Sequence, residues 1–184
     1  MPNFDEINRG LLLELQKNAR RSNRELARTL GIADSTCLER VKNLQQSEVI
    51  VGYNAEVNLD ALGRGLKAMI AVRIHPKSRH AVESFREFVL TLGEVLDVFV
   101  VSGSDDFQVL VAVQDPQHLE DFVLDRIAQF PSVADLHASL VYEHLQRRPV
   151  EILAPKPRRR RPAAELTGPV STRTSRPAGT PPSA

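Results

Sequence analysis

Polar residues whose side chains can hydrogen-bond to the bases and phosphates of a nucleic acid are concentrated between residues 24 and 43. Arginine donates bidentately to guanine, asparagine pairs with adenine, and glutamate accepts from the amino group of cytosine. Hydroxyl side chains in the first turn of a helix can hold a phosphate together with the free backbone N–H groups. The candidate contact residues are Arg24, Ser35, Thr36, Glu39, Arg40, Lys42 and Asn43.

Two short predicted helices position these residues. Ser22 and Glu25 have the spacing of a capping box, which marks the start of a helix. Gly31 stands where that helix should end, because glycine adopts the left-handed conformation of a helix C-terminus without strain. Asp34 is expected to cap the helix that follows.

The second of these helices has one apolar and one polar side. Cys37, Val41 and Leu44 repeat at i, i+4 and i+7 and are expected to face the core, which turns the candidate residues outward. A short helix, a tight glycine-containing turn and a second amphipathic helix make a helix-turn-helix, whose second helix enters the major groove of DNA. Residues 50–53 are predicted as a short strand, which would complete a winged form of the motif.

The middle of the chain alternates strand and helix patterns. Strands are predicted at 66–74, 95–101, 107–113 and 134–145, and helices at 79–92 and from Asp115 to before Pro131. The order β-α-β-β-α-β is the ferredoxin-like arrangement, so the fold class is α+β. Two helices cover only one face of such a sheet. The other face also carries apolar residues and needs a partner, which predicts a dimer in which two sheets pack face to face.

The expected domains are a helix-turn-helix at 1–53, a linker at 54–64, a ferredoxin-like ligand-sensing and oligomerisation domain at 65–148, and a disordered Pro/Arg-rich tail at 149–184. Seven of the twelve prolines lie from residue 155 onward. The basic block 157–162 either contacts DNA phosphates or keeps the protein in solution. If the block contacts phosphates, deleting 155–184 should make the slope of log K for DNA binding against log salt concentration less steep by about two to four.

Composition and charge exclude several classes of protein. The formal net charge is +1, but seven of the 24 Lys and Arg residues and one of the 23 acidic residues lie in 155–184, which leaves 17 basic and 22 acidic side chains before it. Binding to DNA therefore has to use a local face. No membrane-spanning stretch and no signal peptide is found, so the expected location is the cytoplasm. The single Cys37 excludes an intramolecular disulfide.

In this order, the motifs resemble the Lrp/AsnC (feast–famine) family of bacterial transcriptional regulators over residues 4–146. The matching stretches are 13–20, 22–23, 25–27, 37–44, Ile50 with 52–55, the hairpin 101–107, and 130–133. The resemblance implies a sequence-specific regulator that binds double-stranded DNA. It also implies homodimers that associate into higher oligomers and an amino acid or similar small effector.

The resemblance places an effector site between dimers, near the hairpin turn. Asp105 or Asp106 could accept hydrogen bonds from an ammonium group, and backbone N–H groups at Gly103 and Ser104 could donate to a carboxylate. The same four residues also make an ordinary hairpin turn.

Three positions depart from the family pattern. Ala33 replaces the usual serine at the start of the second helix, and Glu48 replaces the usual glycine after it. The Thr-x-Thr of the last strand is here Leu136-His137-Ala138, so Leu136 and Ala138 make the effector pocket more apolar. Either the effector differs, being larger or more hydrophobic, or there is none.

Two alternatives compete with a regulator. A stand-alone metabolite sensor with weakened DNA binding would account for Ala33 and Glu48. A small ferredoxin-like enzyme is the second, with Tyr142 and His144 as the only candidates to converge in a cleft. We expect no catalysis, no cofactor and no metal, because the five histidines lack metal-ligand spacing and no phosphate-binding glycine loop is present.

Overall fold

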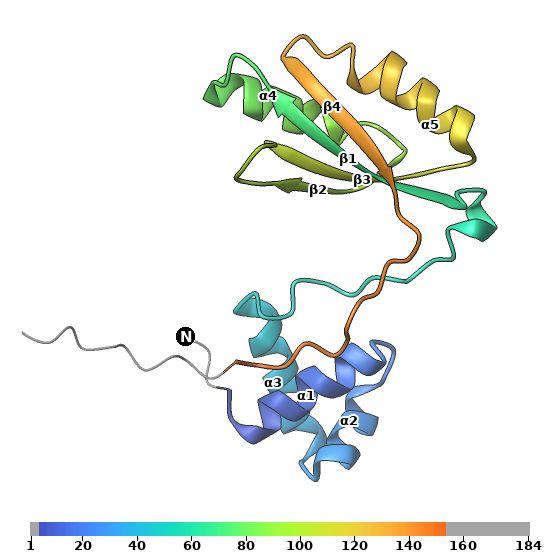
Figure 1. Ribbon diagram of the computed structural model, residues 1–184. Helices are drawn as coiled ribbons and strands as arrows, with labels where there is room; N and C mark the ends of the chain where they lie inside the picture. The colour runs from blue at the N-terminus through green and yellow to red at the C-terminus, as the bar shows by residue number, and fades with distance from the viewer. Residues whose placement is uncertain (1–3, 154–184) are drawn as a thin grey trace, which may run out of the picture. The chain divides into compact units, whose positions relative to one another are not determined.

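The computed structural model describes residues 4–153, which contain a helical N-terminal part and a C-terminal part built on a β-sheet (Figure 1). Each part has its own cluster of buried apolar side chains. The basic tail from residue 154 onward lies outside the described residues.

Three helices form the N-terminal part: α1 (Glu6–Lys17), α2 (Asn23–Leu30) and α3 (Asp34–Gln46). Their shared core consists of Leu11, Leu15, Leu26, Ala27, Cys37, Val41 and Leu44. The i, i+4, i+7 spacing of the last three residues therefore identified the inner side of α3 correctly. At the start of α1, the side chain of Asp5 accepts a hydrogen bond from the backbone N–H of Asn8 at 2.8 Å.

The predicted strand at 50–53 is wrong for the single chain. Backbone N–H groups of Val49 and Ile50 both donate to the carbonyl of Leu44 and close the end of α3, and no strand follows before β1. Val51 is 91% exposed and Tyr53 is 46% exposed. A strand needs a neighbouring chain to satisfy its backbone groups, and this segment has none within residues 4–153. Within residues 4–153, the helix-turn-helix therefore has no wing.

The C-terminal part contains a four-stranded antiparallel sheet. Its elements are η1 (Asp60–Leu62), β1 (Leu66–Ile74), α4 (Arg79–Val89), β2 (Val95–Val100), β3 (Phe107–Val113), α5 (Pro116–Phe122), the π-helical turn η2 (Val123–Ile127) and β4 (Val133–Leu140). The strands lie in the order β2-β3-β1-β4. This is the ferredoxin-like arrangement that the sequence predicts.

Both helices of this part lie on the same face of the sheet (Figure 1). Phe85 from α4 and Phe122 from α5 are buried in one cluster with alternate residues of the two central strands, such as Ile70 and Val109. The ring of Phe85 lies 4.7 Å, centroid to centroid, from that of Phe107. The core of the sheet domain thus fills the space between sheet and helices.

The opposite face of the sheet carries the other half of each strand, because side chains alternate between faces. Met69 pairs with Leu110 on β3 and with Ser139 on β4, and Phe99 pairs with Gln108. Neither α4 nor α5 covers this face (Figure 1). Phe99 is 48% exposed.

The last strand ends at Leu140, five residues earlier than predicted. Its only neighbour in the sheet is β1, and Leu140 already pairs with Ala68 near the beginning of that strand. One more backbone hydrogen bond joins Val141 N–H to the Lys67 carbonyl at 2.9 Å. Beyond Val141, the chain forms no further pairing with a strand within residues 4–153. Sequence patterning alone does not reveal where this pairing ends.

Candidate nucleic-acid interface and ligand site

Helix α2 and the turn after it have the predicted local structure. Ser22 N–H donates to Glu25 Oε2 at 2.7 Å, and Glu25 N–H donates to Ser22 Oγ at 3.3 Å, so the capping box is complete. Gly31 has φ +65°, in the left-handed region. A β-carbon there would meet no atom within 4 Å, so only the backbone conformation requires glycine.

The predicted cap of α3 is wrong by one residue. Ala33 occupies the N-cap position, and no side chain caps the helix. Asp34 is instead the first helical residue, where a carboxylate still interacts favourably with the positive end of the helix dipole. Turn geometry after Gly31 determines which residue begins the helix, and the sequence does not specify it to one residue.

The polar side of α3 is exposed, with one exception. Ser35, Thr36, Glu39, Lys42 and Asn43 are exposed, and so is Arg24 on α2. None of these six side chains makes a hydrogen bond or ion pair to another part of the protein within residues 4–153. They are therefore available to an external partner.

Arg40 is the exception, because contacts with the start of α1 hold one end of its half-buried side chain. Its Nη1 donates to Asp5 Oδ2 at 2.5 Å and to Asn8 Oδ1 at 3.1 Å, and its side chain is 31% exposed. Both partners lie on or beside the first turn of α1. No pattern in the sequence links residues 35 positions apart, so this contact could not be predicted.

Arg40 shares a groove with three other candidate residues. The groove has a volume of about 480 Å³, and its walls are the first turn of α1 and the polar side of α3. Its lining includes Thr36, Glu39, Arg40 and Asn43 together with Asp5 and Asn8. Four of the seven candidate contact residues are therefore brought together in one place.

Further arginines surround α2, in two different roles. Arg20, Arg24 and Arg28 are exposed. Arg21 instead forms an ion pair with Glu14 of α1 and donates to Thr29 Oγ1 at 2.6 Å. The first three supply solvent-exposed positive charge, whereas Arg21 contacts both α1 and α2.

In the C-terminal domain, the hairpin turn between β2 and β3 contains the candidate effector residues. Gly103 has φ +131°, a conformation that side chains disfavour, and a β-carbon there would meet nothing within 4 Å. Gly103 and Ser104 are exposed. Asp105 is half-buried and accepts from Ser104 Oγ at 3.2 Å and Gln108 Nε2 at 3.4 Å.

Asp106 is engaged within the protein. It is 6% exposed, its Oδ2 accepts from the backbone N–H of Ile74 at 2.9 Å, and its Oδ1 forms an ion pair with Lys77. Its own backbone N–H donates to the Val72 carbonyl at 2.9 Å. The carboxylate thus fastens the hairpin to the end of β1.

The charge of Asp106 is stabilised by these contacts. Burial raises the pKa of this carboxyl, but the hydrogen bonds from Lys77 and from the Ile74 N–H lower it more, so the pKa lies below its ordinary value. Asp106 is therefore ionised at neutral pH and already has its partners. Asp105 is the more accessible of the two acceptors.

Leu136 and Ala138 do not join the turn within one chain. They lie on β4 and pair with Val72 and Ile70 of β1, while the turn extends from β3 on the other side of β1. Two strand spacings, roughly 10 Å, separate β4 from β3. Leu136 is half-buried and Ala138 exposed.

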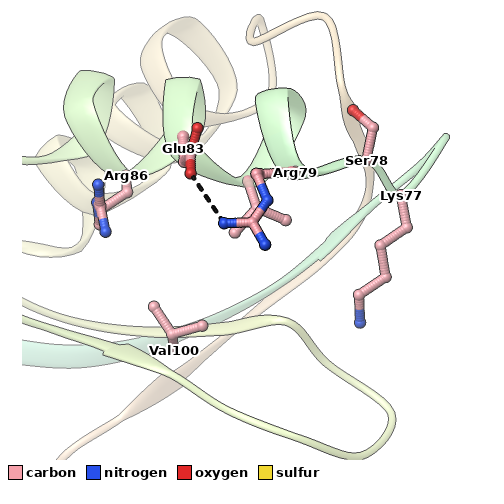
Figure 2. A pocket seen from close by; sticks show the side chains of 7 residues that line it. Lys77, Ser78, Arg79, Glu83, Arg86 and Val100 are labelled. Atoms are coloured by element: carbon pink, nitrogen blue, oxygen red, sulfur yellow. Dashed lines mark ion pairs between the residues drawn. The ribbon is translucent and has the colours of Figure 1, made fainter.

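A second groove lies beside the hairpin, between α4 and the end of β2 (Figure 2). It has a volume of about 410 Å³, and Lys77, Arg79 and Arg86 line it with Val82 and Val100. Arg79 is paired loosely with Glu83, with 3.8 Å between Nη1 and Oε1. Lys77 is 66% exposed and Arg79 90% exposed, so this positive charge is solvated.

The two side chains that suggested catalysis line one open groove of about 620 Å³, but both are highly exposed. Tyr142 is 97% exposed and His144 is exposed, both beyond the end of β4. Cys37 is fully buried, and burial together with nearby Asp34 raises the pKa of its thiol. Among residues 4–153, no group of three His, Cys, Asp or Glu side chains could hold a metal ion.

Comparison with known families matches both parts of the chain. The AsnC-type helix-turn-helix domain matches residues 4–45, and the Lrp/AsnC ligand binding domain matches residues 67–151. A DNA-binding helix-turn-helix joined to a ligand-binding domain defines the class of protein, a transcriptional regulator.

Individual relatives agree. The HTH-type transcriptional regulator AldR of Mycolicibacterium smegmatis is 39% identical over 143 residues, which cover 78% of this chain and 84% of that protein. The leucine-responsive regulatory protein of Escherichia coli K12 is 30% identical over 143 residues, 78% of this chain and 87% of that protein. The chain therefore belongs to the Lrp/AsnC family of transcriptional regulators.

Solved structures support the same assignment. A transcriptional regulator from Neisseria meningitidis, in complex with L-Met, matches with a TM-score of 0.74 at 30% identity over 79% of this chain and 94% of the other. The crystal structure of AldR from Mycobacterium tuberculosis matches with a TM-score of 0.64 at 34% identity, over 77% and 94%.

These comparisons exclude the enzyme alternative, since the family consists of regulators, and they favour a DNA-binding regulator over a sensor without DNA binding. Among the described residues, no helix is both long and apolar enough to cross a membrane.

Proposed function

We propose that this regulator contacts DNA through the exposed polar side of α3. The observation that carries the proposal is the division of α3 into two sides. Cys37, Val41 and Leu44 are buried, and the residues between them are exposed with no partner in residues 4–153 except at Arg40. The contact residues in this proposal are Arg24, Ser35, Thr36, Glu39, Arg40, Lys42 and Asn43.

We propose further that the functional unit is a homodimer that assembles into higher oligomers. The uncovered sheet face, with Phe99 half-exposed, supports packing of one sheet against another. Two recognition helices then meet successive major grooves about 34 Å apart or a multiple of that distance, so the operator is pseudo-palindromic. Sedimentation analysis tests the assembly, and a monomer at micromolar concentration would contradict it.

The proposed effector is an amino acid that binds at the hairpin turn. Asp105 accepts from its ammonium, and N–H groups of Gly103 and Ser104 donate to its carboxylate. Leu136 and Ala138 come from another copy in this proposal, because they lie away from the turn in a single chain. They replace hydroxyl side chains with apolar ones, which favours a hydrophobic amino acid.

A mobility-shift assay with the promoter region of the protein's own gene tests the DNA site. Asn43→Ala removes one exposed side chain, and Glu120→Ala on α5 is the matched control. The proposal expects weaker binding for the first variant only. Retention of full binding by Asn43→Ala, Lys42→Ala and Thr36→Ala together would refute it.

Calorimetric titration with the twenty amino acids tests the effector. We expect a hydrophobic amino acid to bind and Asp105→Asn to weaken binding, whereas Asp121→Asn on α5 has no effect. If no amino acid binds at millimolar concentration, the effector proposal fails.

The proposed regulator also has the domain limits 1–53, 54–64 and 65–148 and a cytoplasmic location.

A further inference from the structure

Asp5 is assigned to DNA binding neither by the family match nor as one of the candidate contact residues, and the role given to it here rests on the proposed function of α3. Asp5 makes two contacts, one through each of its carboxylate oxygens. Oδ1 accepts from the Asn8 backbone N–H at 2.8 Å and caps α1, while Oδ2 accepts from Arg40 Nη1 at 2.5 Å. Its carboxylate therefore connects the start of α1 with the side chain of Arg40.

These contacts use only one end of the Arg40 fork. Nη1 is bound by Asp5 and Asn8, whereas Nε and Nη2 have no protein partner within residues 4–153. A side chain of this length normally samples many rotamers, and fixing one of its nitrogens removes much of that freedom. The remaining donors are thus presented in a restricted orientation.

The charge of the groove indicates what these donors can bind. Asp5 and Glu39 line the groove with Arg40, so two carboxylates accompany one guanidinium. A site with more negative than positive charge does not attract a phosphate. Base edges are neutral, and the O6 and N7 atoms of guanine match the geometry of an arginine fork.

We infer that Asp5 is a positioning residue that orients the Arg40 guanidinium toward a guanine in the major groove. Asn8 supports the same orientation through its side-chain oxygen. The exposed arginines Arg20, Arg24 and Arg28 supply the phosphate contacts, because none of them is held in an ion pair within residues 4–153.

Selection from a random duplex library, performed with the full-length protein, tests this role without a known operator. Asp5→Asn removes the charge and keeps a good N-cap, since asparagine caps helices as well as aspartate does. Glu6→Gln is the matched control, because Glu6 is exposed, carries the same charge one residue away and has no contact with Arg40.

The wild-type protein and Glu6→Gln should select guanine at one position of each half-site. In Asp5→Asn, the preference for guanine there should fall about tenfold, with other positions retained. Arg40→Lys should lose the same preference, because an ammonium lacks the fork. The double variant Asp5→Asn, Arg40→Lys should lose no more of the guanine preference at that position than Arg40→Lys alone.

Two results would overturn the inference. If Asp5→Asn melts at a lower temperature but selects the same sequence as the wild type, Asp5 only ties α1 to α3. If the slope of log K against log salt concentration becomes steeper by about one in Asp5→Asn, the released Arg40 contacts a phosphate instead. Failure of the wild type to select any sequence would refute the proposed function of α3 itself, which is a separate outcome.

Discussion

Replacement of Asp106 should destabilise the ligand-binding domain more than its single ion pair would suggest. Its carboxylate accepts from the backbone N–H of Ile74 at 2.9 Å, in a place where Asp106 is only 6% exposed. Asp106→Ala removes this acceptor and leaves a buried donor without a partner. We therefore expect the hairpin to loosen from the end of β1.

The magnitude follows from the two contacts taken separately. An unsatisfied buried N–H costs about 1–3 kcal/mol. Lys77 is 66% exposed, so its ion pair with Asp106 is screened by solvent and contributes at most about 1 kcal/mol. Asp106→Ala should therefore lower the free energy of unfolding by about 1–4 kcal/mol, and Lys77→Ala by at most about 1 kcal/mol.

The effect should depend on pH in a defined direction. Burial raises the pKa of Asp106, but the hydrogen bonds from Lys77 and Ile74 outweigh burial, so the pKa in the folded protein lies below its ordinary value. The ionised carboxylate therefore contributes stability above about pH 4, and this contribution is lost as the pH falls through the folded-state pKa. The stability difference between the wild type and Asp106→Ala should shrink over that range.

Hydrogen exchange of the Ile74 amide, together with urea unfolding at pH 7 and below pH 4, measures these effects. Ile74 should exchange much faster in Asp106→Ala than in the wild type, and Lys77→Ala should change it little. Equal protection of the Ile74 amide in the wild type and Asp106→Ala at pH 7 would refute the proposed role of this hydrogen bond.

Two further predictions concern left-handed residues of the helix-turn-helix. Glu48 has φ +56° without being glycine, so Glu48→Gly should raise the free energy of unfolding by about 0.5–1 kcal/mol, relief of strain exceeding the added freedom of the unfolded chain. Gly31→Ala should lower the free energy of unfolding by about 1–2 kcal/mol, because φ is +65° there. Since the added β-carbon would meet no atom within 4 Å, this cost is backbone strain alone. Urea unfolding of the full-length protein measures both changes.

Matched controls separate backbone strain from charge at these positions. Glu48→Gln removes the negative charge near the C-terminal end of α3 and keeps the strain, so it should gain only a few tenths of a kcal/mol. A gain as large as that of Glu48→Gly would attribute the effect to charge. Stability unchanged by Gly31→Ala would show that the turn can relax into another conformation.

Features that depend on local chemistry could be predicted from the sequence. The capping box of Ser22 and Glu25, the left-handed Gly31 and the buried side of α3 each follow from residue type and spacing within one or two turns. The alternation of strands and helices likewise gave the order of elements in the sheet domain. In these places, local propensity and tertiary structure agree.

Features that depend on distant partners could not be predicted. The Asp5–Arg40 and Asp106–Ile74 contacts join residues 35 and 32 positions apart, and both change the expected role of a candidate residue. The end of β4 at Leu140 and the missing strand at 50–53 depend on whether a neighbouring chain is present. Sequence patterning describes one segment at a time and carries no information about its neighbours.

Fluorescence anisotropy with DNA selected by the wild-type protein most directly tests the claim that the polar side of α3 contacts DNA. The triple variant Thr36→Ala, Lys42→Ala, Asn43→Ala changes only exposed side chains, so its melting temperature should match that of the wild type. Its affinity for the selected DNA should fall at least about tenfold. Unchanged affinity in the folded triple variant would contradict the account and place the contact surface elsewhere.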